Sequence, residues 1–303
     1  MMKRPDYRSL NIALCLTLFA SMIAFAQSEK IIFKMAPEPN QTIRTKLVHE
    51  MEIDMNFEGD LPTKDPAYGP TKMVAKMVLS LTQKVGAPDK DGNVTSEVTY
   101  DESAFEMTMN GQPMPFGDAA SKIAGKKVSI TFDRKGDIVD IKIPPDPSLV
   151  VEYLKEMMKS IYGNLPNAQI GVGEIVTSPL DFMLLIPITD APPLTVNGQS
   201  KFKLASVEKD STCRFAKIDQ TADGKLNSVL EIATPEGKVK MKVDFKLSGA
   251  GDMAVNLDKG FVRSGDLKTT FGGKIEMANE PSGKKSPTLN LQGTMKITIA
   301  GSN

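Results

Sequence analysis

The strongest constraint on the fold of this 303-residue chain is an alternation of apolar and polar residues with a period of two. It is clearest over 238–247, where four lysines and an aspartate alternate with Val239, Met241, Val243, Phe245 and Leu247. Successive side chains of a strand point to opposite faces, so this segment is predicted to be a strand with one buried and one wet face. Such two-sided strands are typical of antiparallel sheets.

The same alternation recurs along most of the chain and predicts ten further strands. They are expected at 45–57, 72–85, 93–108, 127–132, 137–143, 200–207, 213–221, 226–233, 265–271 and 289–299. Turns are expected where Gly, Asp or Pro gather, at 88–92, 133–136, 222–224 and 235–237. These residues supply the backbone conformations that tight turns need.

One segment carries a helical pattern instead. Asp146-Pro147 offers an N-cap and a first-turn proline, and an apolar stripe including Leu154, Met157 and Met158 follows over 148–162. Gly163 is a suitable stop. The fold class expected is therefore mainly β (α+β): a long curved antiparallel sheet, or sheets, with one substantial amphipathic helix.

The N-terminus has the pattern of a secretory signal peptide. Lys3, Arg4 and Arg8 precede a short apolar run over 12–20, and small residues end it at Ala24-Phe25-Ala26. Cleavage is expected near Ala26, which leaves a periplasmic or extracellular protein. The apolar run is too short for a good membrane span, so no transmembrane segment is expected in the mature chain.

The mature chain is expected to divide near residue 170. The hairpin pattern over 130–143 is similar to the one over 253–267, which indicates an N-terminal β-rich half at 27–170 and a C-terminal antiparallel half at 171–303. The helix at 148–162 would belong to the first half. Two similar sheet halves related by duplication are one alternative within this fold class.

Charge and cysteine content exclude several functions. Lys+Arg and Asp+Glu both number 37, and removal of the signal leaves a net charge near −2. This balance gives no general attraction to nucleic acid. Cys213 is the sole cysteine after residue 26, so no intrachain disulfide can form and a buried thiol is expected.

No motif of catalysis or metal binding is complete, and neither a cofactor nor a metal is expected. His49 is the single histidine and no Gly-x-Ser-x-Gly elbow accompanies it, so it is placed on the wet face of its strand. Copper(I) is an alternative, because His49, Met51, Met55, Met107 and Met109 carry soft donors. Core packing of those methionines is the simpler interpretation.

Several short motifs together resemble an uncharacterised family of exported bacterial β-rich proteins, known as a domain of unknown function. They are the signal, the strands 128–133 and 136–141, the amphipathic helix, the segment 171–174 opening a strand, and the hairpin at Asp258-Lys259-Gly260. A curved antiparallel sheet with a helix on one face is also loosely similar to the periplasmic lipoprotein-carrier fold. That likeness implies a hydrophobic groove without catalysis.

The function expected is therefore that of a non-enzymatic envelope protein that binds a hydrophobic, lipid-like ligand or a partner protein. The candidate groove lining comprises Leu154, Met157, Met158, Val239, Met241, Val243, Phe245 and Leu247. The alternative is a secreted hydrolase that uses two carboxylates, since Asp and Glu are plentiful.

Overall fold

The computed structural model describes residues 30–32, 37–59, 69–114, 124–143, 168–184, 194–234, 237–277 and 287–303. The side chains of 181–184, 194, 232–234, 237–239 and 277 are outside that description. The helix expected at 148–162, with Leu154, Met157 and Met158, also lies outside the described residues.

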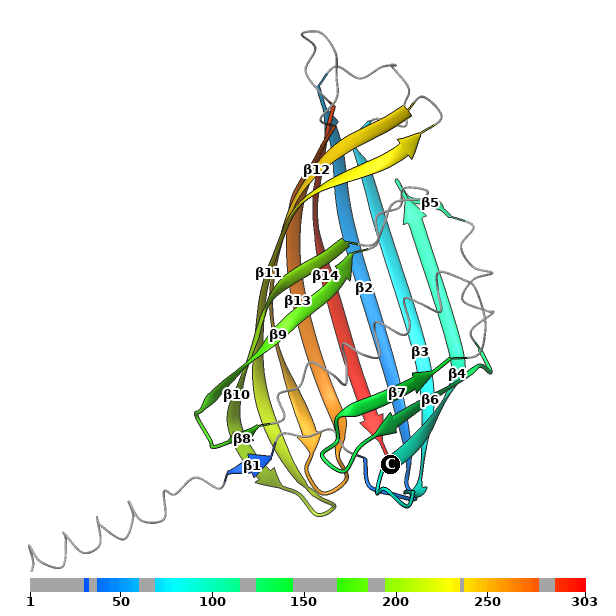
Figure 1. Cartoon of the computed structure of the whole chain (residues 1–303), viewed down its shortest axis with the longest axis vertical. Helices are drawn as coiled ribbons and strands as arrows, with labels where there is room; N and C mark the ends of the chain where they lie inside the picture. Colours follow the sequence, from blue (N-terminus) through cyan, green and yellow to red (C-terminus); the bar gives the residue numbers. More distant parts are fainter. Residues whose placement is uncertain are drawn as a thin grey trace, which may run out of the picture.

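The described residues form one twelve-stranded antiparallel sheet and a separate two-stranded ribbon (Figure 1). The ribbon pairs β1 (Ile31–Ile32) with β8 (Gln169–Ile170). The sheet contains β2 (Thr42–Glu58), β3 (Thr71–Pro88), β4 (Val94–Met109), β5 (Gln112–Pro113), β6 (Lys127–Phe132), β7 (Ile138–Lys142), β9 (Ile175–Leu184), β10 (Leu194–Lys209), β11 (Arg214–Thr234), β12 (Gly237–Asn256), β13 (Phe261–Met277) and β14 (Thr288–Ser302).

The sheet consists of two meanders joined at its centre. Its order is β7-β6-β4-β3-β2-β14-β13-β12-β11-β10-β9, with the short β5 paired to β4. The first meander therefore runs outward from β2, and the second runs inward to β14, which pairs with β2 along its length. Figure 1 shows both ends of the sheet, β6–β7 and β9–β10, folded round toward the same side. The result is one strongly curved sheet; the division near residue 170 stays a prediction.

The predicted α+β class is wrong for the described residues, which are 79% strand and contain no helix. The antiparallel sheet itself was predicted correctly, because alternation reports directly on strands with one buried face. None of the described residues belongs to a helix long and apolar enough to cross a membrane.

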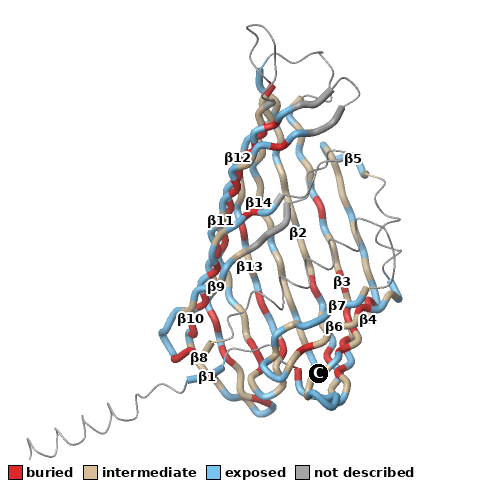
Figure 2. The backbone as a smooth tube through the Cα atoms, in the orientation of Figure 1, coloured by how far each residue is buried: buried red, intermediate tan, exposed pale blue. Residues whose placement is uncertain are grey.

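The two faces of the sheet differ sharply in chemistry, and the central strand β2 illustrates this. Its odd-numbered residues include Ile43 and Leu47, which are buried, whereas even-numbered Arg44, Glu50 and Asp54 are exposed. Buried and exposed residues alternate in the same way along the other long strands (Figure 2). Ion pairs such as Lys76–Glu50 connect neighbouring strands across the charged face.

The apolar face is the concave one. In the described part of the chain only the ribbon and the sheet itself are available to cover it, yet Leu79, Ile130 and Leu204 have an exposed fraction of 0%. A single sheet buries side chains this well when curvature brings them together. The ribbon adds cover at one end, where Ile31 and Ile170 join a cluster with residues of β10, β11 and β12.

Glycines on the concave face make room for aromatic rings. Phe271 lies opposite Gly293, and Phe245 lies opposite Gly273 on the next strand. The two rings stack with their centroids 5.6 Å apart. Glycine beside a ring is a device that lets a sheet curve without crowding its inner face.

A bulge in β4 keeps its apolar residues on the concave face. Ser80 of β3 is opposite Glu102, but the next residue, Leu81, is opposite Tyr100, so Asp101 is unmatched. The extra residue switches the inner face from even numbers, such as Val98, to odd numbers, such as Met107. The sequence shows the same switch, because its apolar residues change parity at this point.

Two of the four expected turns are present, and the turn expected at 235–237 falls on residues 235 and 236, which lie outside the described residues. The turns at 89–92 and 133–136 place Gly92 and Gly136 at positive φ, where glycine is unstrained. The turn expected at 222–224 is wrong: β11 runs through it as one strand of 21 residues. Gly224 there faces Val196 and Leu247, so it serves close packing between strands instead of a reversal of the chain.

Candidate functional site

The concave face contains an apolar surface that is only half-buried, and methionine dominates it. We call it the methionine patch; it comprises Met51, Ile53 and Met55 of β2, Met73 and Met77 of β3, Phe105, Met107 and Met109 of β4, and Met295 of β14. Seven of the chain's 18 methionines are thus gathered on four adjacent strands. Methionine is flexible and polarisable, and it is over-used on surfaces that accept varied apolar partners.

The register of the strands aligns the patch into rows across the sheet. Met295, Met51, Ala75 and Met107 are successive cross-strand neighbours on β14, β2, β3 and β4. In the adjacent row, Ile297, His49, Met77 and Phe105 are neighbours in the same order. The alternation in the sequence placed each methionine on one face of its own strand, but the pairing between strands depends on tertiary packing. Met73 and Met77 were therefore not recognised as part of a methionine cluster.

The candidate lining on β12 has a different environment. Met241, Val243, Phe245 and Leu247 share the concave face, as their alternation predicted, but their exposed fractions are 4%, 1%, 3% and 9%. They pack in a cluster with residues that include Val196, Leu226 and Leu230. The side chain of Val239 is not described, and its backbone is opposite Ile232. Their role in ligand binding stays a prediction, while the more accessible apolar surface lies on the methionine patch.

His49 is on the apolar face, which corrects its expected place on the wet face. Its number is odd, like those of the inward residues Leu47 and Met51 on the same strand. Its Nε2 atom is buried and has no hydrogen-bond partner. Burial lowers the pKa of the imidazole below its ordinary value of 6.5, because desolvation disfavours the charged form.

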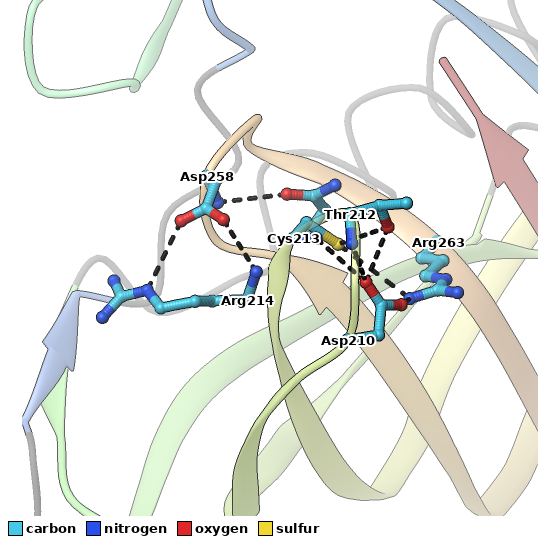
Figure 3. Close-up of polar contacts among 7 residues, drawn as sticks. Asp210, Thr212, Cys213, Arg214, Asp258 and Arg263 are labelled. Carbon is cyan, nitrogen blue, oxygen red and sulfur yellow. Dashed lines mark hydrogen bonds and ion pairs between the residues drawn. The ribbon is translucent and has the colours of Figure 1, made fainter.

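A dense polar cluster surrounds the turn between β10 and β11 (Figure 3). Asp210 accepts hydrogen bonds from the backbone N–H groups of Thr212 and Cys213, from the Thr212 hydroxyl and from Arg263 of β13. These bonds, with that of Thr212 first, hold the pKa of Asp210 well below its ordinary value. Arg263 also lies over the ring of Phe215, 5.1 Å from its centroid.

A second link in this cluster joins the start of β11 to the turn between β12 and β13. Asp258 accepts a hydrogen bond of 2.7 Å from the backbone N–H of Arg214 and pairs with its guanidinium. Cys213 is free and buried, as expected from its sequence context. The bonds of the cluster lie within the turn between β10 and β11 or join it to Arg263 of β13, and Asp258 joins the start of β11 to the next turn, so together they hold neighbouring hairpins in place.

The described carboxyl groups do not show the raised pKa that the general acid of a hydrolase needs. Each carboxyl group with a displaced pKa in the described ranges, namely Asp89, Asp133, Glu208 and Asp210, has a lowered pKa that favours the ionised form. A general acid needs the opposite shift. The hydrolase alternative thus gains no support from these groups.

A shallow hollow of about 380 Å³ lies where β2 ends and β3 and β14 begin, and its lining mixes polar residues, such as Asp54, Asn56, Glu58, Asn290 and Gln292, with the apolar Met55 and Leu291. Asp54 and Glu58 are four residues apart on one strand, roughly 13 Å at about 3.3 Å per residue. Catalytic carboxyl pairs of glycosidases are about 5–9.5 Å apart. Over the described ranges, no three His, Cys, Asp or Glu residues are grouped to hold a metal ion.

Comparison with known proteins adds little. No protein-family model matches the chain, and no curated protein matches it. Among solved structures, a lipovitellin chain ("Lipid-protein interactions in lipovitellin") is similar to this chain. The TM-score is 0.46 and the sequence identity is 9%, over 88% of this chain and 26% of that chain. This chain therefore spans about a quarter of the lipovitellin chain's length, and its function rests on its own residues.

Proposed function

We propose that this chain is a non-enzymatic exported protein that binds a hydrophobic, lipid-like ligand on the concave face of its sheet. The observation that supports this most directly is the contrast between the two faces. The convex face is charged, whereas the concave face is apolar and is left half-buried at the methionine patch. A contiguous apolar surface of this kind on a polar protein is typical of a binding site.

The residues of the patch suit a flexible apolar ligand. Methionine side chains adapt their shape through three rotatable bonds, so a Met-lined surface can accept acyl chains that differ in length and unsaturation. No charged residue belongs to the patch as defined above, so a polar headgroup would remain at its margin. The ligand class that fits is therefore a molecule with a long hydrocarbon portion.

Export is part of the proposal and has its own test. The basic residues, apolar run and small residues of 1–26 support cleavage near Ala26. When the full chain is expressed in a bacterial host, the protein recovered outside the cytoplasm is expected to begin at Gln27. Recovery of only the uncleaved chain in the cytoplasm would contradict export.

Ligand binding is tested with two variants of adjacent residues on opposite faces. Met73→Lys places a charge on the patch, whereas Val74→Lys places the same charge on the convex face, where Val74 is 40% exposed. Gentle native mass spectrometry of the wild type should show co-purified lipid, and a fluorescent fatty acid should bind. We expect Met73→Lys to lose binding by at least tenfold and Val74→Lys to retain it.

Thermal melts of both variants check that they remain folded. Absence of lipid and of fatty-acid uptake in the wild type would refute the proposal. Equal binding by the two variants would also refute the placement of the ligand on the concave face.

A further inference from the structure

Four methionines surround one alanine at the centre of the patch. Ala75 is directly opposite Met51 on β2 and Met107 on β4, and Met73 and Met77 precede and follow it on the same face of β3. Ala75 is 5% exposed, whereas each of the four methionines is half-buried. We call Met51, Met73, Met77 and Met107 the methionine ring.

The spacing allows the four thioethers to converge. Cβ atoms of residues directly opposite in an antiparallel pair are about 4.5–5.5 Å apart, and residues two apart on a strand are separated by roughly 7 Å. Ala75 has no atom beyond Cβ, so the long side chains around it can occupy the space above it. Methionine sulfur, which is the third atom beyond Cα, can reach that space from every side.

His49 adds a nitrogen donor to the ring. It is directly opposite Met77 and two residues from Met51, so it is diagonal to Ala75. Its Nε2 is buried without a partner, which is an unusual state for a polar atom and needs an explanation. The residues directly opposite it or two positions away on the same face are Ile297, Met77, Leu47 and Met51, none of which is charged.

This donor set matches one class of ion. Thioether and imidazole ligands select soft cations such as Cu(I), whereas Ca²⁺ and Mg²⁺ require oxygen ligands that the ring does not contain. A monovalent ion among neutral donors also brings less charge into an apolar surface than a divalent ion would. We propose that Met51, Met77 and Met107, with His49 Nε2, bind Cu(I) above Ala75. Met73 lies on the remaining side of Ala75 and completes the methionine ring around the ion.

Substitution by leucine conserves apolar volume but removes the sulfur, so it removes a metal donor while the concave face stays apolar. The double variant Met51→Leu/Met77→Leu and the single variant His49→Leu test the ring. Met253→Leu is the matched control, since Met253 is on the concave face of β12, outside the ring. Each protein is titrated with Cu(I) under anaerobic reducing conditions against a chromogenic Cu(I) chelator, and with Ag(I) as a redox-inert probe in native mass spectrometry.

We expect one Cu(I) or Ag(I) per chain in the wild type and in Met253→Leu. The two ring variants should bind Cu(I) and Ag(I) at least tenfold more weakly and still unfold cooperatively in thermal melts, so that the loss of binding is not a loss of folding. X-ray absorption of the Cu(I) form should show mixed sulfur and nitrogen neighbours. Failure of the wild type to compete with the chelator, or wild-type affinity in the double variant, would show that the methionines serve packing alone.

Discussion

The ring of Phe271 covers Gly293 on the neighbouring strand. A Cβ built on Gly293 would lie 2.6 Å from Cζ of Phe271 and closer still to the backbone oxygen of Glu52. Both distances are shorter than real contacts allow. This glycine therefore lets β13, β14 and β2 approach closely where the sheet curves.

Gly293→Ala is accordingly expected to destabilise the protein by about 1–3 kcal/mol, the usual cost of overpacking a well-packed core. Urea denaturation followed by circular dichroism measures it. Gly272→Ala is the matched control, because the nearest atom to a Cβ there is 3.6 Å away. Equal stability of the two variants would contradict the close approach at Gly293.

The β4 bulge gives a prediction about register. Deletion of Asp101 removes the unmatched residue, so Phe105, Met107 and Met109 would turn to the charged convex face unless the bulge re-forms elsewhere. We expect the deletion to abolish cooperative unfolding or to lower the melting temperature by well over 10 °C. The substitution Asp101→Asn keeps the residue count and should cost little, mainly through the 2.6 Å hydrogen bond from Thr82. A deletion variant as stable as this control would show that the bulge does not set the register.

Local alternation in the sequence predicted most of the strands. It could not predict which residues of different strands lie next to one another. Alternation identified β12 and the inward set from Met241 to Leu247, because it depends only on neighbouring residues. It could not show that Ala75 lies between Met51 and Met107, since strand register is set by packing across the sheet. The turn expected at Gly224 failed for a similar reason: its glycine accommodates Val196 and Leu247 from other strands.

His49 was misplaced because a polar residue was assigned to the polar face. The parity of its number, shared with Leu47 and Met51, was the better signal. The methionine patch could have been anticipated in part from the same parity. The assembly of the patch from four strands could not have been anticipated, because β14 pairs with β2 only when the two meanders join.

The Asp210 cluster predicts a loss of stability in acid. The pKa of Asp210 is lowered in the folded state, chiefly by the Thr212 hydroxyl and then by Arg263, so its stabilising effect is full above the ordinary value of 3.8. It is lost as the pH falls below that value. Asp210→Asn should thus lower the melting temperature at pH 7 and differ less from the wild type near pH 3.

Asp223→Asn, at an exposed position on the convex face of β11 opposite the uncharged Ser248 and Gln199, is the control for this comparison. Melting curves of the three proteins at both pH values supply the measurement. A deficit in Asp210→Asn that is the same at pH 3 and pH 7 would mean that the charge of Asp210 is not what stabilises the turn.

The charge state of His49 in the metal-free protein should affect its stability. Burial lowers its pKa, so the folded protein resists a proton that the unfolded chain accepts near pH 6.5. His49 is neutral in both states above about pH 7.5 and then adds no pH dependence; as the pH falls through 6.5, stability decreases until the folded pKa is reached. His49→Leu should remove this decrease between pH 7.5 and 5.5. It should also stabilise the protein by roughly 1 kcal/mol at pH 7.5, because the unpaired Nε2 is no longer buried. Urea denaturation at the two pH values measures both effects, and NMR titration of the single histidine reads its pKa directly. A measured pKa at or above 6.5 would refute the burial of a neutral imidazole on the concave face.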